Sequence, residues 1–244
     1  MKTVLLAVVL FVAGSVLAAD VLIYTKFGQK KGQYIHSCVK PCAHAVKELC
    51  ERNGLTTEIT DDPGMLTPEK LKQVKSVVLA STNNEIVDTD AQRDALMDYV
   101  ANGGGLVSIH SALASERSCR RFREMVGSTF VMHPSQQPFD VEVIDAGHRI
   151  LKDVNSADWK GWVDELYVCE TAPNIHVVMS ADLSKLKDAQ KVLDKGFKIV
   201  PVVYTVPFGK GRSVVLTPGH NDADYQKLQW RKLIENAILW SLER

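Results

Sequence analysis

The stretch Gly103-Gly104-Gly105-Leu106-Val107-Ser108-Ile109-His110-Ser111 decides how this chain of 244 residues folds and where its chemistry lies. Glycines interrupt the chain, a short apolar run follows, and a histidine stands at its carboxyl end. A continuous apolar run of this length, bounded by turn residues, predicts a strand that is buried on both faces. Open α/β sheets bind their ligands at the carboxyl ends of the strands, so His110 is the first candidate for chemistry.

Similar apolar runs alternate with amphipathic helical patterns through the first half of the chain. The patterns predict strands at 21–24, 57–60, 77–80 and 106–110, and helices at 39–50, from Thr67, and at 90–101. Such alternation predicts an α/β fold with a parallel sheet, whose right-handed crossovers bring the carboxyl ends of all strands to one edge. The second half is less regular, with strands expected at 141–144, 175–179, 199–206 and 213–216 and helices at 118–126 and 225–242.

The charge balance and the N-terminal segment limit the classes of partner. The chain has 29 basic and 29 acidic residues, which gives no electrostatic reason to expect nucleic acid or an anionic membrane as a partner. Residues 1–18 fit a secretory signal peptide, with cleavage after Ala18 or Ala19, and their apolar run is shorter than the roughly 20 residues that span a bilayer. We therefore expect an exported protein, periplasmic or extracellular, without stable membrane insertion after signal removal. A single domain is expected over residues 20–244, and the sequence leaves open whether several copies assemble.

The five cysteines are Cys38, Cys42, Cys50, Cys119 and Cys169. An oxidising compartment permits disulfides, but the odd number leaves at least one thiol free. The favoured interpretation is that they pack as small apolar side chains. A bridge or a metal site at Cys38 and Cys42 is a weaker alternative, because no second cysteine pair has zinc-like spacing.

Four histidines stand where a predicted strand or irregular segment ends. His110 and His220 follow strands, His133 precedes Pro134, and His36 lies in the loop after the first strand. Imidazole takes up and releases protons near neutrality, so histidines that meet in one cleft would suit acid–base chemistry. We expect Asp222 to orient His220. The remaining histidines, His44, His148 and His176, are interpreted as ordinary surface or strand residues.

A second group of residues points to sugars, and several common motifs are missing. Asp164 and Glu165 follow Trp159-Lys160-Gly161-Trp162, a pattern that fits either aromatic stacking on a sugar ring or a loop packed by tryptophan. The chain lacks the glycine-rich and P-loop motifs that bind nucleotides. It also lacks the G-x-S-x-G elbow, so Ser111 is a poor nucleophile candidate.

A longer set of residues carries a resemblance to a known family. The set comprises the loop with His36, 58–63, 103–112, Phe122, Gly127, Phe130, His133-Pro134, Gln137, Asp145, His148, 164–167, Pro201, 209–212, Gly219-His220, Tyr225 and 238–240. In their order and spacing these residues resemble the ThuA-like (trehalose-utilisation) family of the class I glutamine amidotransferase-like superfamily. The resemblance implies a flavodoxin-like three-layer sandwich with a mostly parallel central sheet. It also implies a role in the use of disaccharides, including sugars oxidised to 3-keto forms.

The comparison with true amidotransferases changes the expected chemistry. Those enzymes place a nucleophilic cysteine at the turn where this chain has His110, and Cys119 is not positioned to replace it. Glutamine hydrolysis through a thioester is therefore not expected. The segment His220-Asn221-Asp222 resembles the histidine and acid of the same catalytic triad. Ser108, Arg149 and Val203-Tyr204 depart from the family pattern and put the substrate in doubt.

These observations lead to one predicted function and two alternatives. We expect an exported carbohydrate-active isomerase, lyase or hydrolase that performs acid–base chemistry on a disaccharide or 3-keto-sugar. The expected catalytic residues are His110, His133 and His220, and the expected substrate-binding residues are His36, Asn83, Ser111, Gln137 and Glu165. One alternative is a non-catalytic sugar-binding module. The other is a metal-dependent hydrolase or lyase, with zinc or a similar divalent metal held by the three catalytic histidines and Glu165.

Overall fold

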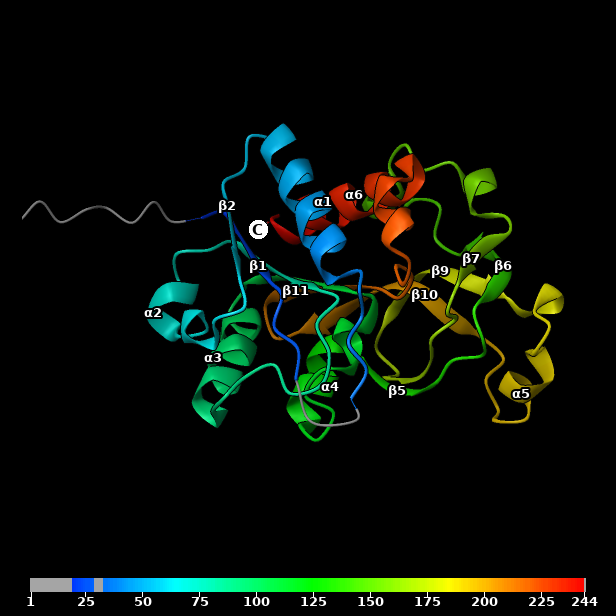
Figure 1. Cartoon of the computed structure of the whole chain (residues 1–244), viewed down its shortest axis with the longest axis horizontal. Helices are drawn as coiled ribbons and strands as arrows, with labels where there is room; N and C mark the ends of the chain where they lie inside the picture. The colour runs from blue at the N-terminus through cyan, green and yellow to red at the C-terminus, as the bar shows by residue number, and fades with distance from the viewer. Residues whose placement is uncertain (1–18, 29–32, 244) are drawn as a thin grey trace, which may run out of the picture.

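The computed structural model describes residues 19–28 and 33–243, so the signal peptide expected at 1–18 lies outside the described residues. A nine-stranded sheet with the order β2-β1-β3-β4-β11-β10-β9-β6-β7 forms the centre of the protein (Figure 1). Its strands are β1 (Val21–Tyr24), β2 (Thr57–Thr60), β3 (Ser76–Ala80), β4 (Gly105–Ile109), β6 (Gln137–Val143), β7 (Trp162–Asp164), β9 (His176–Asp182), β10 (Val200–Phe208) and β11 (Gly211–Leu216). The predicted α/β class is confirmed.

One half of the sheet is parallel. The pairs β1–β2, β1–β3, β3–β4 and β4–β11 all run in the same direction, which brings their carboxyl ends to one edge. β1, β3 and β4 are buried along their whole length, as their apolar runs predict, whereas the edge strand β2 is partly exposed. The order β2-β1-β3 places a topological switch point between β1 and β3, where open sheets of this kind bind ligands.

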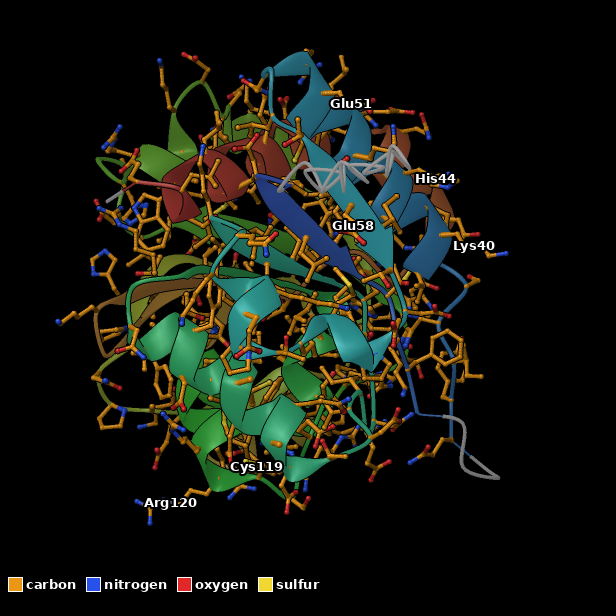
Figure 2. All side chains as sticks on the ribbon, turned by 90° about the vertical axis from the view of Figure 1, so that its left-hand side faces the viewer. Lys40, His44, Glu51, Glu58, Cys119 and Arg120 are labelled. Carbon is orange, nitrogen blue, oxygen red and sulfur yellow. The ribbon has the colours of Figure 1, made fainter. Side chains whose placement is uncertain are left out.

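Helices cover both faces of the sheet and complete three layers (Figure 1). α1 (Val39–Arg52) and α6 (Leu228–Ser241) pack on one face, and α2 (Pro68–Leu71), α3 (Asp90–Ala101) and α4 (Arg120–Val126) pack on the other. The outer side of α1 carries Lys40, His44 and Glu51 (Figure 2). α6 begins later than predicted, because 222–226 form a separate 3₁₀ turn before it.

The other half of the sheet is antiparallel. β10 pairs in this sense with β11 and β9, and β6 pairs with β9 and β7. A separate two-stranded pair joins β5 (Ser128–Met132) to β8 (Val168–Thr171), and the short helix α5 (Ala189–Leu193) follows β9. β5, β7 and β8 were not expected from the sequence.

The sequence leaves open whether the tryptophans stack on a sugar or pack a core, and whether the cysteines form a disulfide. The structure answers both questions. The rings of Trp159 and Trp162 lie 4.9 Å apart, and each lies 6.1 Å from the ring of Trp230. All three are buried, so they pack a core and do not stack on a sugar. The five cysteines are free thiols. Within the described part of the chain, no helix has the length and apolar character needed to cross a bilayer.

Candidate functional site

His110 occupies a sharp turn at the carboxyl end of β4. Its backbone φ of 52° lies in the left-handed region, which costs a residue other than glycine about 1–3 kcal/mol. The ring is fully buried, and Nδ1 lies 2.9 Å from the carbonyl oxygen of Thr217. Because a carbonyl only accepts hydrogen bonds, Nδ1 donates, and the lone pair of the neutral ring is on Nε2. Nε2 has no hydrogen-bond partner.

His36 approaches His110 from the loop between β1 and α1. The ring centroids of these two histidines are 4.8 Å apart, and that of His36 lies 5.4 Å from that of His220. The Nε2 atom of His36 lies 3.3 Å from the hydroxyl of Tyr167. Its Nδ1 atom is buried and has no hydrogen-bond partner.

Asp164 joins the two segments that carry Glu165 and His220. This buried carboxylate at the end of β7 accepts hydrogen bonds from the backbone N–H groups of Glu165, Gly219 and His220, and from the indole of Trp162. The Glu165 carboxylate oxygen Oε2 then lies 3.2 Å from Nδ1 of His220 and 3.9 Å from Nε2 of His110.

The sequence-based role of Asp222 is wrong. The Asp222 carboxylate accepts a hydrogen bond from the Ser37 hydroxyl at 2.7 Å, and Asp164 is the acid that holds the backbone of His220. Proximity in sequence favoured Asp222, but the 3₁₀ turn that begins at this residue directs its side chain to the β1–α1 loop.

His133 stands on the open side of the same group. Its Nδ1 atom lies 3.7 Å from Oε1 of Glu165 and donates to the carbonyl of Pro134 at 3.0 Å. The His133 ring stacks on that of Tyr167, with centroids 5.6 Å apart and planes at 17°. The side chain is 36% exposed, whereas that of Glu165 is 15% exposed and that of His110 is inaccessible. His133 is therefore the most accessible of these three side chains.

Burial and charge set the protonation of the group in the metal-free protein. Burial, together with the neighbouring imidazoles, lowers the pKa of His36 to about 3 and lowers the pKa of His110 to about 4, although the contact with Thr217 opposes the second shift. Contact with the Glu165 carboxylate raises the pKa of His220. Burial alone would raise the pKa of Glu165, but the contact with His220 and the other nearby imidazoles lowers it. His36 and His110 are therefore neutral at pH 7.

His110, His133 and His220 all approach Glu165, and His36 joins them. His36, His110, Glu165 and His220 each offer one potential metal-ligand atom, and these atoms all lie within 4.8 Å of one another. The metal set expected from the sequence contained His133, and His36 takes its place. We use the term histidine cluster for these four residues.

Three other predicted substrate-binding residues are held by polar partners of their own. The Ser111 hydroxyl donates to the carbonyl of Ser81, and the Gln137 side chain accepts from the N–H of Lys187. The Asn83 side chain accepts from the backbone N–H of the next residue. Their contact with a substrate stays a prediction.

Sequence reasoning missed the aromatic side chains of the site. The Tyr167 ring lies 4.6 Å from the ring of His110 and also contacts His36 and His133. The exposed Tyr34 ring stacks on the His220 ring at 6.4 Å. Tyr167 lies only two residues beyond Glu165, in the segment 164–167 that carries the family resemblance. This proximity to Glu165 is the sequence feature from which a role for Tyr167 in the site could be predicted.

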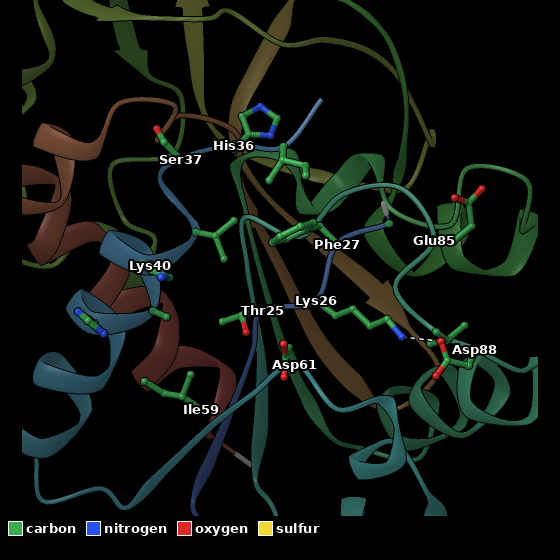
Figure 3. A pocket seen from close by; sticks show the side chains of 16 residues that line it. Thr25, Lys26, Phe27, His36, Ser37, Lys40, Ile59, Asp61, Glu85 and Asp88 are labelled. Atoms are coloured by element: carbon green, nitrogen blue, oxygen red, sulfur yellow. Dashed lines mark hydrogen bonds and ion pairs between the residues drawn. The ribbon is translucent and has the colours of Figure 1, made fainter. Parts of the chain in front are cut away.

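A cavity of about 1110 Å³ adjoins the histidine cluster at the switch point of the sheet. His36 is among the residues that line the cavity (Figure 3), and it is also a member of the histidine cluster. The rest of the lining comes from the ends of β1 and β2, the start of α1 and the segment after β3, and it includes Thr25, Phe27, Val39, Lys40, His44, Ile59, Asp61 and Asp88. The lining combines apolar and charged groups, as small-molecule sites usually do.

Comparison with known proteins agrees with the resemblance found in the sequence. A ThuA-like protein from Bacteroides uniformis is 21% identical, with a TM-score of 0.68 over 92% of this chain and 91% of that one. A ThuA-like protein from Parabacteroides merdae is 18% identical, with a TM-score of 0.69 over 92% and 90% of the two chains. An exo-β-1,4-mannosidase from Opitutaceae bacterium strain TAV5 is 11% identical, with a TM-score of 0.53 over 92% of this chain and 36% of that enzyme. At these identities the likenesses show the fold alone.

A search of curated proteins finds no match to the chain. The family model described as ThuA, trehalose utilisation, matches residues 20–241. Because this match spans nearly the whole chain, the protein belongs to the ThuA family, which is connected with trehalose utilisation.

Proposed function

We propose that this ThuA-family protein is an exported enzyme that transfers protons on a disaccharide or on its 3-keto derivative. The observation that carries the proposal is the meeting of His133 with the histidine cluster at one accessible edge of the sheet. The family connects the chain with carbohydrate use, and the sequence pattern at 1–18 supports export. The absence of a cysteine at the His110 turn argues against glutamine hydrolysis.

His133 is the residue best placed to accept a proton. Since its Nδ1 atom donates to the carbonyl of Pro134, the lone pair of the neutral ring is on Nε2. A ketone at C3 of a sugar acidifies the C–H bond at C2, because the electron pair can move to the ketone oxygen. We expect His133 to remove this proton and the oxygen, where negative charge develops, to lie beside His220, the imidazole of the cluster whose pKa the Glu165 carboxylate raises.

The proton that His133 removes can be used in two ways. Delivery of the proton to C3, with transfer of the hydroxyl proton from the C2 oxygen to the C3 oxygen, moves the ketone to C2 and isomerises the sugar. Alternatively, the enolate expels the oxygen bonded to C1, and this oxygen takes the proton, which completes an elimination. The cavity beside His36 has room for a second sugar ring, with Phe27 as an apolar surface and Lys40 and Asp61 as partners for hydroxyl groups.

Turnover of a panel of 3-keto-glycosides tests the proposal. We expect His133→Ala to lower kcat about 10²- to 10⁴-fold, the usual contribution of a general acid or base. His176→Ala is the matched control, because His176 is an exposed histidine at the start of β9. Exchange of the C2 proton with D₂O, followed by NMR, reports proton removal directly. Equal exchange in wild type and His133→Ala would refute the role of His133, and calorimetric binding of sugars without any product would favour the sugar-binding module.

A further inference from the structure

We infer that His36, His110, His220 and Glu165 bind one divalent transition-metal ion of the zinc class. The four side chains come from segments far apart in the sequence, yet one ligand atom of each lies within 4.8 Å of all the others. Zinc–nitrogen bonds of about 2.0–2.1 Å place tetrahedral ligand atoms roughly 3.3 Å apart. A closing movement of at most roughly 1.5 Å between ligand atoms would complete the shell, which side-chain rotations can supply.

Buried ring nitrogens of the cluster lack hydrogen-bond partners. Nδ1 of His36, Nε2 of His110 and Nδ1 of His220 are buried without hydrogen-bond partners, although the last lies 3.2 Å from the Glu165 carboxylate. Leaving a buried polar atom unpaired costs about 1–3 kcal/mol, so such atoms are rare in proteins. The free nitrogens of His36 and His110 lie beside the pair of His220 and Glu165 and indicate a missing common partner; a cation that displaces the proton between His220 and Glu165 would bind all four groups at once.

In His110 and His36, the ring nitrogen that does not face the cluster already has a polar partner, as is usual for metal-binding histidines. Nδ1 of His110 donates to the Thr217 carbonyl, which leaves the lone pair of Nε2 directed into the cluster. Nε2 of His36 contacts the Tyr167 hydroxyl, which leaves Nδ1 for the metal. Metal-binding histidines almost always donate their second N–H to such an outer partner, because this selects the tautomer and orients the ring.

The set of ligands selects the class of metal. Three imidazoles suit zinc, iron, copper or nickel, whereas magnesium and calcium prefer shells made of oxygen atoms. Glu165 supplies one negative charge, so the bound site keeps a net positive charge. His133 lies outside this set, and its exposed side leaves a route by which a substrate oxygen could reach the ion. A bound cation would stabilise the negative charge that develops on a ketone oxygen.

Metal content and a cobalt spectrum test the inference without any substrate. We expect the purified wild-type protein to bind about one ion per chain, and the chelator-treated protein to give visible cobalt absorption bands typical of a site with nitrogen and oxygen ligands. His36→Ala and His110→Ala should weaken cobalt binding by more than the roughly 10- to 100-fold that loss of an outer partner costs. Circular dichroism and a second pair of variants, His36→Gln and His110→Gln, exclude loss of the fold as the cause.

Two controls separate this site from other metal-binding groups and from the proposed reaction. His176→Ala removes the surface pair of His176 and Asp145, which could bind zinc weakly, and should leave cobalt binding unchanged. His133→Ala should also keep the metal, whereas the proposed function expects it to lose turnover. The inference is overturned if wild type binds no zinc or cobalt, or if His110→Ala and His110→Gln bind cobalt as tightly as wild type. A metal-free but active wild type would refute this inference alone.

Discussion

Replacing Asp164 with asparagine tests the connection that places Glu165 and His220 side by side. The substitution keeps the shape of the side chain but turns one carboxylate oxygen into an NH₂ group. Oδ2 accepts from the N–H of Gly219 at 2.7 Å and from the indole of Trp162 at 3.1 Å. Oδ1 accepts from the N–H groups of Glu165 and His220 at 2.7 and 3.3 Å. Whichever way the amide turns, two donors lose their acceptor and face another donor; the pair on Oδ2 is buried and the pair on Oδ1 is partly buried.

The magnitude follows from these contacts. Each buried donor left without a partner costs about 1–3 kcal/mol, so two cost roughly 2–6 kcal/mol. An opposing effect reduces this loss, because burial raises the pKa of Asp164 and the neutral amide avoids burying a charge. We therefore expect Asp164→Asn to lower the free energy of unfolding by roughly 2–4 kcal/mol. If the further inference holds, cobalt binding should also weaken about 10- to 100-fold, because Asp164 sets the position of two ligands.

Urea unfolding at pH 7, followed by circular dichroism, measures the first effect. Asp158→Asn is the control, since Asp158 is exposed on the neighbouring 3₁₀ turn and its loss should change stability by less than about 0.5 kcal/mol. A loss below about 1 kcal/mol for Asp164→Asn would refute the reasoning, because the donors would then have found other acceptors or the carboxyl group would already be neutral.

Three further variants test the fold and the electrostatics of the site. In chelator-treated protein, the contribution of His110 to the free energy of unfolding should fall by roughly 3 kcal/mol between pH 6.5 and pH 4. The reason is that the ring gains its proton near pH 6.5 in the unfolded chain but only near its pKa of about 4 in the folded protein. Urea titrations at several pH values should therefore show a steeper loss of stability in wild type than in His110→Asn. Glu116→Ala removes the buried acceptor of Arg93 and of the Ile86 N–H and should cost about 1–3 kcal/mol, because Arg93 keeps Asp90 as a partner; an unchanged urea midpoint would contradict this. Gly211→Ala should fold poorly or lose more than about 3 kcal/mol, since the added Cβ would lie 2.0 Å from the carbonyl oxygen of Val100, and thermal unfolding checks it.

The first half of the fold could be predicted because local signals and burial agree there. α3 spans Asp90–Ala101 as expected, since Thr89 and Gln92 form a capping box at its start and Asn102 and Gly103 end it. β1, β3 and β4 are buried on both faces, which requires the apolar runs that the sequence displays. In the second half, β7 has only three residues and β5 is largely half-buried, so neither produces a periodic pattern.

The sequence is sufficient to predict where the site lies, but not how its side chains are arranged. Parallel topology brings His36, His110 and His220 to one edge, and the sequence is sufficient to infer this. Which ring nitrogen is free depends on loop carbonyls such as those of Thr217 and Pro134, and no local pattern specifies these contacts. For the same reason the sequence names His133 where the histidine cluster has His36, and Asp222 where the structure places Asp164 against the backbone of His220.

Strained backbone conformations are concentrated at the carboxyl ends of β3 and β4. Their location helps to explain why position 110 holds a histidine. Of the five non-glycine residues with positive φ in the described part of the chain, Ser81, Asn84, His110 and Glu116 lie in the segments that follow β3 and β4. Glycine at position 110 would relieve about 1–3 kcal/mol of strain, so stability alone does not favour a histidine there. The resemblance to glutamine amidotransferases that the sequence carries implies a nucleophilic cysteine at the corresponding turn of those enzymes. Here the same turn fixes an imidazole through Thr217 and places its free nitrogen beside His36, His220 and Glu165, as the inferred metal site requires.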